Sequence, residues 1–188
     1  MVVWSILPER AIGFDMTTHQ RDPKLYRDNV GLALFSGAGH VFVGRRINGR
    51  GAYQWQMPQG GVDPDEAPAD AVLREMEEEI GVSAKFVDVL DQTDDWLYYD
   101  FPLALRKRMG GPFLGQRQKW FALRFKGTDS EVRLDKHKPE FDAWRWARLE
   151  DVPGLVVPFK RPVYEAVAKQ FAPWSDRLAA NGANPAPR

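Results

Sequence analysis

The stretch Gln59-Gly60-Gly61-Val62-Asp63-Pro64-Asp65-Glu66, followed after seven residues by Arg74-Glu75-Met76-Glu77-Glu78-Glu79-Ile80-Gly81-Val82, decides the fold of this chain. A glycine-rich loop containing a proline leads into a segment whose apolar residues, Val72, Leu73, Met76 and Ile80, recur at helical spacing. Pro68 suits a first helical turn, and Gly81 suits the end of a helix. The stretch therefore predicts a loop and an amphipathic helix that packs against a sheet.

Three glutamates of this helix have the spacing of a single face. Glu75, Glu78 and Glu79 stand at i, i+3 and i+4. Two carboxylates about 4 Å apart repel by about 4 kcal/mol at an effective dielectric constant of ~20. A cation removes that repulsion, and clustered hard oxygens suit Mg²⁺ or Mn²⁺. The alternative is a solvated glutamate-rich face, and the surrounding residues decide between the two.

The spacing of the whole stretch resembles the signature of the Nudix hydrolase family. That signature is glycine, five residues, glutamate, seven residues, then Arg-Glu-apolar-any-Glu-Glu-any-Gly-apolar. The matching positions are Gly60, Glu66, Arg74, Glu75, Met76, Glu78, Glu79, Gly81 and Val82. Seven fixed residue types, each used at ~5–7%, match by chance about once in 10⁸ starting positions. The resemblance implies the Nudix α/β/α sandwich, an α/β fold with a mixed β-sheet between helices.

Composition limits the classes of function. The chain has 188 residues, 44% of them apolar and 28% charged, which is typical of one globular domain. Its formal net charge is zero, so a polyanion site must be local, and we expect no DNA partner. Cysteine is absent, which excludes thiolate nucleophiles and fits the reducing cytoplasm. No apolar run approaches ~18 residues and no basic region precedes the apolar N-terminus, so we expect no membrane segment and no signal peptide.

The remaining elements can be placed along the chain. Strands are expected at 30–35, 41–43, 53–57, 85–90, 96–101, 119–125 and 143–147, and a closing helix at 162–171. Residues 1–25 are expected to form a poorly ordered or loosely packed extension, 26–174 the Nudix domain, and 175–188 a flexible tail. The basic run 106–108 precedes Gly110-Gly111-Pro112, which predicts a flexible loop.

Five further segments narrow the resemblance to one branch of the family. Segments 26–31, 55–61, 115–121, 140–146 and 159–164 resemble, in this order, the bacterial RNA pyrophosphohydrolases, also described as dinucleoside polyphosphate hydrolases. The resemblance covers about residues 26–172. It implies a divalent-metal enzyme that removes pyrophosphate from 5′-triphosphorylated RNA, leaves a 5′-monophosphate and so promotes mRNA decay. The alternative is hydrolysis of diadenosine tetra- or pentaphosphate at the same site. An inactive binding module is disfavoured because every signature position is intact.

The resemblance also implies a role for individual residues. Glu75, Glu78, Glu79 and Glu140 are the expected metal ligands. Glu78, Glu79 and Glu140 are the expected catalytic residues, and the general base is one of the helix glutamates or an acid elsewhere. In the signature itself, Arg74 is expected to orient a glutamate by ion pairing, Glu66 to favour the helix dipole, and Gly81 to end the helix.

On the substrate side, Gly60 and Gly61 permit close approach of phosphate. Arg27 and Lys160 are expected near the phosphates, Arg46 and Phe159 on either side of a base, and Tyr99 beside the substrate.

Several of these positions have plainer interpretations. Without the family, Phe159 reads as a core residue, Arg46 as solvent-facing and Tyr99 as a half-buried strand residue. The basic clusters at 106–108, 117–119 and 136–138 could guide an RNA backbone or be solvated loop charges. Met57 replaces a common phenylalanine and the loop at 48–52 is longer than expected, which leaves base preference and RNA length open. The sequence carries no signal that identifies a protein partner.

Overall fold

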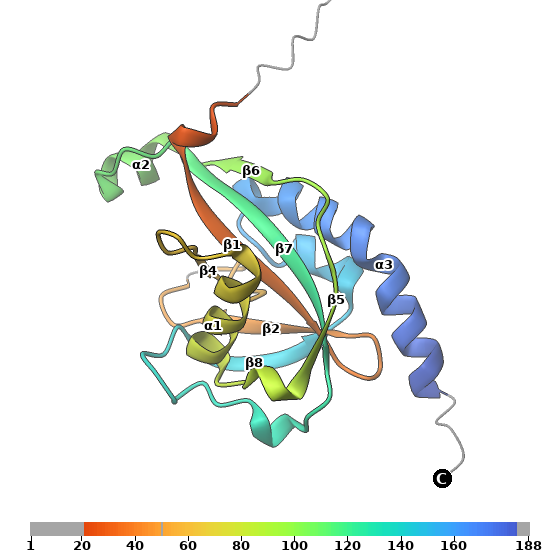
Figure 1. Cartoon of the computed structure of the whole chain (residues 1–188). Helices are drawn as coiled ribbons and strands as arrows, with labels where there is room; N and C mark the ends of the chain where they lie inside the picture. Colours follow the sequence, from red (N-terminus) through yellow and green to blue (C-terminus); the bar gives the residue numbers. More distant parts are fainter. Residues whose placement is uncertain (1–20, 50, 184–188) are drawn as a thin grey trace, which may run out of the picture.

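The computed structural model describes residues 21–49 and 51–183, in which eight strands form one mixed sheet (Figure 1). Of the predicted N-terminal extension, residues 1–25, positions 1–20 lie outside the described residues. The strands are β1 (Tyr26–Phe35), β2 (Val41–Arg46), β3 (Trp55–Gln56), β4 (Gln59–Gly61), β5 (Val87–Gln92), β6 (Leu97–Asp100), β7 (Gly115–Phe125) and β8 (Phe141–Ala147). Three α-helices accompany them: α1 (Pro68–Ile80), α2 (Leu103–Met109) and α3 (Arg161–Ala183).

The centre of the sheet is a parallel pair of its two longest strands. β1 and β7 pair in register from Tyr26 opposite Gly115 to Phe35 opposite Arg124. The main path runs β3-β2-β1-β7-β5, while β4 pairs with β1, β6 with β7 and β8 with β2, all antiparallel. The expected mixed sheet is confirmed.

Side chains of β1 alternate between two apolar layers. Val30, Leu32 and Leu34 face the layer that contains α1, with Val72, Met76 and Ile80 buried in it. Ala33 and Phe35 face the layer that contains α3, with Trp120, Tyr164, Val167 and Phe171. Alternation with a period of two accounts for this division, because both faces of a central strand are covered. Helices on opposite faces confirm the predicted α/β/α sandwich (Figure 1).

Two glycines permit this packing. Gly31 in β1 lies under the indole of Trp120, and a Cβ there would come within 2.5 Å of the ring. Gly81 ends α1 at φ = 71°, a left-handed conformation that favours glycine, and its N–H donates to the carbonyl of Glu77. The predicted end of the first helix at Gly81 is therefore confirmed.

Two short elements depart from the predictions. Residues 103–109, where the sequence predicts a flexible basic loop, form α2, which extends from Pro102 to a left-handed Gly110 at φ = 65°. Gln59–Gly61, predicted as part of the loop before α1, pairs with β1 as β4. The described residues also include five 3₁₀ turns, at Pro23–Leu25, Ala84–Phe86, Asp129–Glu131, Leu149–Gly154 and Pro158–Lys160.

The C-terminal helix is longer than the sequence predicts. The sequence predicts a helix at 162–171 and a tail from 175, but α3 continues to Ala183 with Pro173 inside it. A proline within a helix costs about 3 kcal/mol, so tertiary contacts must compensate for it. Trp174 donates from Nε1 to Asp91 at 3.0 Å, Ser175 donates to the carbonyl of Gly39 at 2.8 Å, and Leu178 is 5% exposed. None of the helices among the described residues is both long and apolar enough to cross a membrane.

Candidate active site

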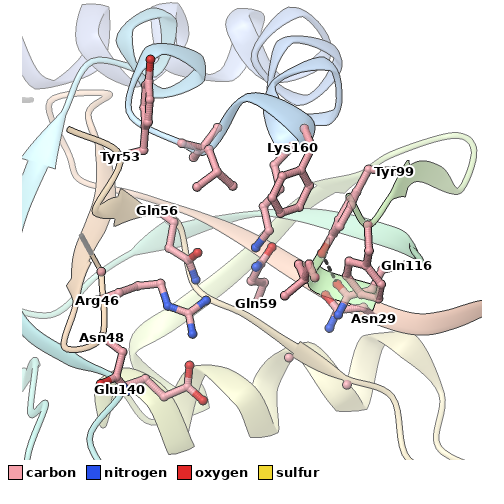
Figure 2. Close-up of a pocket in the computed structure, with 18 of the residues that line it drawn as sticks. Asn29, Arg46, Asn48, Tyr53, Gln56, Gln59, Tyr99, Gln116, Glu140 and Lys160 are labelled. Atoms are coloured by element: carbon pink, nitrogen blue, oxygen red, sulfur yellow. Dashed lines mark hydrogen bonds between the residues drawn. The ribbon is translucent and has the colours of Figure 1, made fainter. Parts of the chain in front are cut away.

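One cavity of about 790 Å³ contains all the predicted metal and substrate residues. Its walls come from β1, the β2–β3 connection, β4, α1, β6, α2 and the 3₁₀ turn before α3 (Figure 2). The predicted residues that line it are Arg27, Arg46, Gly60, Gly61, Glu75, Glu78, Glu79, Tyr99, Glu140, Phe159 and Lys160. The structure therefore brings together side chains from six separate segments of the chain.

Helix α1 supplies the acidic wall of this cavity. Glu79 is 5% exposed and accepts the backbone N–H of Gln59 at 3.0 Å, which ties the helix to β4. The carboxyl group of Glu75 lies directly against Gly60, where any Cβ would collide with it. Gly60 is thus required by the approach of a carboxylate, in addition to the phosphate approach expected from the sequence. Glu78 is more open, with 49% of its side chain exposed.

The acidic wall is electrostatically unfavourable without a cation. Burial raises the pKa of Glu79 well above its ordinary value, and the charges of Glu140 and Glu75 raise it further. Burial also raises the pKa of Glu75, against the opposing effect of Arg74. Burial and mutual repulsion thus disfavour the charged form of these carboxylates. A hard divalent cation would stabilise that form, and carboxylate oxygens are the ligands that it prefers. The residues present therefore fit the metal that the sequence predicts.

Glu140 enters from a different element. It directly precedes β8, and its carbonyl accepts the N–H of Ile47 at 3.0 Å, so the β2–β8 pairing sets its position. Its side chain reaches the cavity below Arg46 (Figure 2). Across residues 21–49 and 51–183, no three acidic or histidine side chains already converge on a common point. The four glutamates line one cavity, and Glu75 and Glu78 both face Arg74.

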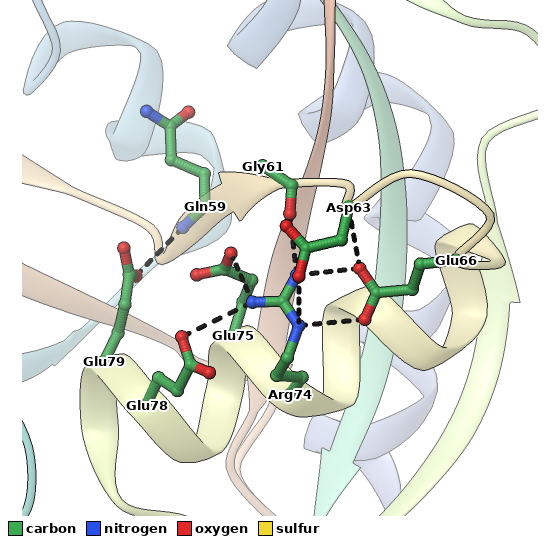
Figure 3. A network of polar contacts seen from close by, with 8 residues as sticks. All are labelled: Gln59, Gly61, Asp63, Glu66, Arg74, Glu75, Glu78 and Glu79. Atoms are coloured by element: carbon green, nitrogen blue, oxygen red, sulfur yellow. Dashed lines mark hydrogen bonds and ion pairs between the residues drawn. The ribbon is translucent and has the colours of Figure 1, made fainter.

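Arg74 connects the loop before α1 to the acidic wall through hydrogen bonds and ion pairs to both (Figure 3). Its Nε and Nη2 donate to the two carboxylate oxygens of Glu66, both at 2.8 Å, and Nη2 also donates to the carbonyl of Gly61 at 2.8 Å. Its Nη1 donates to Glu75 at 2.8 Å and to Glu78 at 3.4 Å. These contacts match the expectation that Arg74 orients a glutamate.

Glu66 acts through that arginine more than through the helix dipole. It precedes the first helical residue, Pro68, by two positions and also accepts the N–H of Asp63 at 3.0 Å. The hydrogen bonds from Arg74 and then from Asp63 lower the pKa of Glu66 to about 2. Glu66 therefore anchors the loop by an ion pair, where the sequence suggests a dipole effect.

Opposite the acidic wall lies a cationic wall. Arg46 and Lys160 reach into the cavity from different sides (Figure 2), and the guanidinium of Arg27 lies against Gly61. Lys160 is 7% exposed, and burial, with the nearby charge of Arg46, lowers its pKa to about 7 against the raising effects of Glu79 and Glu140. A polyphosphate in the cavity would thus meet these three basic side chains, with Arg108 of α2 as a fourth, and one acidic wall.

The expected pair Arg46 and Phe159 both line the cavity, but in this structure Phe159 packs on Tyr99. Their ring centroids are 5.6 Å apart with an interplanar angle of 48°. Tyr99 is 4% exposed, and its hydroxyl donates to Gln116 at 2.6 Å. The Nζ atom of Lys160 lies 5.7 Å from the centroid of the Tyr99 ring. Tyr99 therefore supports the neighbouring site residues by packing.

Sequence reasoning missed the amide network on the floor of the cavity. Gln118 is fully buried, and its Nε2 donates to Asn29 at 2.9 Å, Gln59 at 3.0 Å and Gln116 at 3.2 Å, while its Oε1 accepts from Trp120 Nε1 at 3.0 Å. Asn29, Gln59 and Gln116 line the cavity. The glutamines of Gly115-Gln116-Arg117-Gln118, two residues apart on one strand face, are the signal that predicts such a row.

The fold, the acidic helix and the facing cations together define a class of protein, and the chain belongs to the Nudix family. Residues 25–167 match the NUDIX domain, which is more than half of the chain. Two solved structures share the fold: a C. elegans Ap4A hydrolase (TM-score 0.57, 18% identity, 78% of this chain and 98% of that one) and the E. coli dihydroneopterin triphosphate pyrophosphohydrolase (TM-score 0.58, 18% identity, 78% and 99%).

Within the family, more similar relatives carry the name RNA pyrophosphohydrolase. The protein of that name from Acidiphilium cryptum is 57% identical over 150 residues, which cover 78% of this chain and 90% of that protein. The one from Rhodospirillum rubrum is 52% identical over 148 residues, 78% and 87% of the two chains. The one from Bradyrhizobium is 50% identical over 167 residues, 84% and 97%.

Proposed function

We propose that this protein is an RNA 5′-pyrophosphohydrolase, which converts a 5′-triphosphate end of RNA into a 5′-monophosphate and thereby promotes mRNA decay. One observation carries the proposal: a single cavity has an acidic wall on α1 and a cationic wall of Arg27, Arg46 and Lys160. That pairing suits a polyphosphate whose anhydride bond is hydrolysed with metal assistance. The identity of 50–57% of the aligned residues to three proteins of this name favours RNA as the substrate. Such a substrate also favours a cytoplasmic location.

Glu75, Glu78, Glu79 and Glu140 would hold the divalent cation, with Mg²⁺ preferred and Mn²⁺ as the alternative. When bound, such a cation neutralises phosphate oxygens and lowers the pKa of coordinated water. Arg74 positions the glutamates from behind, since it bridges Glu75 and Glu78 to the loop at Gly61 and Glu66. Because these carboxylates carry like charges in one cavity, the cation would also reduce the repulsion between them.

The other roles in the reaction are proton transfer, phosphate binding and base binding. In the reaction, a water molecule adds to phosphorus, the anhydride bond between the α- and β-phosphates breaks, and inorganic pyrophosphate leaves. A carboxylate among Glu78, Glu79 and Glu140 accepts the proton of that water. Arg27 and Lys160 bind phosphate oxygens, and Gly60 and Gly61 keep the β4 backbone free of side chains beside them. Arg46 and Phe159, which both line the cavity, would hold a base.

A side-by-side assay tests this function. We would measure kcat/KM with Mg²⁺ for a short RNA carrying a labelled 5′-triphosphate and for diadenosine tetraphosphate. We expect pyrophosphate release from the RNA at higher efficiency, and no hydrolysis after removal of the metal by a chelator. Preference for the dinucleotide, with RNA ends left intact, would contradict the proposal and assign the same cavity to free nucleotides.

The variant Glu79→Gln tests the acidic wall. A glutamine side chain has the size of glutamate and can still accept the backbone N–H of Gln59, but it carries no charge. We therefore expect kcat to fall by about 10²-fold or more. Glu77→Gln is the matched control, because Glu77 lies on the same helix, pairs with Lys136 at 2.6 Å and does not line the cavity. Full activity in Glu79→Gln would show that the catalytic assignment of α1 is wrong.

A further inference from the structure

Helix α2 stands at the mouth of the active-site cavity and carries an unbalanced positive charge. Leu105, Arg108 and Met109 line the cavity, while Arg106 and Lys107 lie on the exposed surface of the same helix. Between Leu103 and Leu114 there are three basic residues and no acidic one. In the described part of the chain, none of the ion pairs involves these three cations. On a protein of zero net charge, this is a local attraction for an anion.

The same segment exposes large apolar side chains. Leu103 is 64% exposed, Met109 56% and Phe113 36%, and these are three of the seven exposed large hydrophobic residues in the described chain. Single exposed apolar residues need no explanation, but three within eleven residues of a basic helix form a patch. Basic and aromatic side chains side by side are the combination that binds single-stranded nucleic acid, through phosphates and stacked bases.

A recess beneath α2 connects this patch to the active site. Its walls include Arg106 and Phe113, and it shares Arg27, Phe101, Met109 and Gln116 with the main cavity. Because four side chains border both, a chain that leaves the main cavity can pass directly over the recess. The recess measures about 40 Å³, close to the volume of one water molecule, so a base would lie across its mouth against the exposed side chains of Met109 and Phe113.

A second groove, on the other side of Arg27, carries charges of both signs. Asp63, Asp65 and Glu66 border it together with Lys24, besides Asp28, which already pairs with Arg117. Helix α2, by contrast, presents three cations and no carboxylate. A polyanion that leaves the cavity is therefore attracted more strongly to α2 than to this groove.

We propose that α2 and its recess form a second nucleotide subsite, which binds the part of an RNA chain downstream of the nucleotides in the main cavity. Arg106 binds a phosphodiester group, and Phe113 and Met109 stack a base. This subsite rests on the proposed RNA substrate and adds a requirement to it: RNA long enough to reach α2 is a better substrate than a shorter one.

The test compares two RNA lengths in three proteins. We would measure kcat/KM for 5′-triphosphorylated RNAs of about two and about six nucleotides with the same 5′ sequence. We expect the longer RNA to be preferred about tenfold by the unmodified protein, from the stacking of one base. The double variant Arg106→Ala/Phe113→Ala should lose this preference, while Lys107→Ala, which removes the same charge from the same helix outside both cavities, should keep it. An unchanged preference in the double variant would overturn the subsite, as would an equal loss in Lys107→Ala.

A binding measurement separates failure of the subsite from failure of the proposed function. Fluorescence anisotropy of a 3′-labelled, 5′-monophosphorylated hexanucleotide, without hydrolysis, should give a Kd about tenfold weaker in the double variant and unchanged in Lys107→Ala. Equal Kd values in all three proteins would overturn the subsite whether or not the triphosphorylated RNA is hydrolysed. Arg106→Glu provides a second variant of an exposed side chain, with an expected loss of affinity larger than tenfold.

Discussion

Replacement of Lys160 by methionine is expected to stabilise the fold and to weaken catalysis. Lys160 is 7% exposed, and in the described chain its Nζ has no ion pair or hydrogen bond with another side chain. Burial lowers its pKa from the ordinary 10.5 to about 7. Methionine has a similar unbranched shape, fits a core environment and carries no charge.

The magnitude follows from the difference between the folded and unfolded pKa. The pKa of Lys160 falls from 10.5 in the unfolded protein to about 7 in the folded one. At 1.36 kcal/mol per pKa unit, this lowers the free energy of unfolding by about 5 kcal/mol at any pH where the lysine is protonated in both the folded and the unfolded protein. The cost is complete below pH 7, shrinks as the pH rises and vanishes above 10.5, because the folded pKa lies below the unfolded one. We therefore expect Lys160→Met to raise the free energy of unfolding by several kcal/mol at pH 6 and by much less near pH 10.

Urea unfolding at pH 6, 8 and 10, without added metal, measures this dependence. Lys169→Met is the matched control, because Lys169 lies exposed on α3, the helix that directly follows Lys160. In parallel, kcat/KM for the polyphosphate substrate should fall by about 10²-fold or more, since a cation facing the phosphates is lost. A stability gain that is equal at pH 6 and pH 10 would refute the burial argument, and full activity would refute the phosphate contact.

Two further variants test the acidic wall and its support. Gly60→Ala should reduce kcat at least tenfold with little change in Tm, because the added Cβ must displace the carboxyl group of Glu75; an active Gly60→Ala enzyme would contradict that geometry. Glu66→Gln should lower the free energy of unfolding by about 1–3 kcal/mol at pH 7, from the loss of the charged hydrogen bonds to Arg74. Since the pKa of Glu66 is lowered to about 2, this difference should be complete above pH 5 and disappear as the pH falls towards 2, which chemical unfolding across that range would reveal.

The sequence predicts the helix that carries the glutamates well, because several independent signals coincide there. Apolar spacing, Pro68 and Gly81 all indicate the same thirteen residues. Local sequence signals do not predict the clustering of five other site residues, Arg27, Arg46, Tyr99, Glu140 and Lys160. Residues so far apart in the chain meet through strand pairing, and spacing alone cannot predict that; the family resemblance supplied it.

What the sequence did not predict depends on tertiary contacts. Helix α2 has no buried residue, so no apolar periodicity marks it, although Pro102 and Gly110 flank it as helix boundaries do. The extension of α3 past Pro173 depends on contacts with Gly39, in the turn between β1 and β2, and with Asp91 in β5. The Gln118 network requires knowledge that β7 runs beside β1, since its partners Asn29 and Gln59 come from other strands.

The parallel pairing of β1 with β7 also sets the order of events during synthesis of this protein. Tyr26 finds its partner only when Gly115 has been made, and Lys160, on the cationic wall, comes later still. A nascent chain that ends before β7 contains the complete glutamate-bearing helix but lacks the central strand beside β1. Contacts of such long sequence separation form slowly because a large loop must close first. A growing chain that ends before Gly115 therefore lacks both the central strand pair and the Lys160 side of the cavity, although its glutamate-bearing helix is complete.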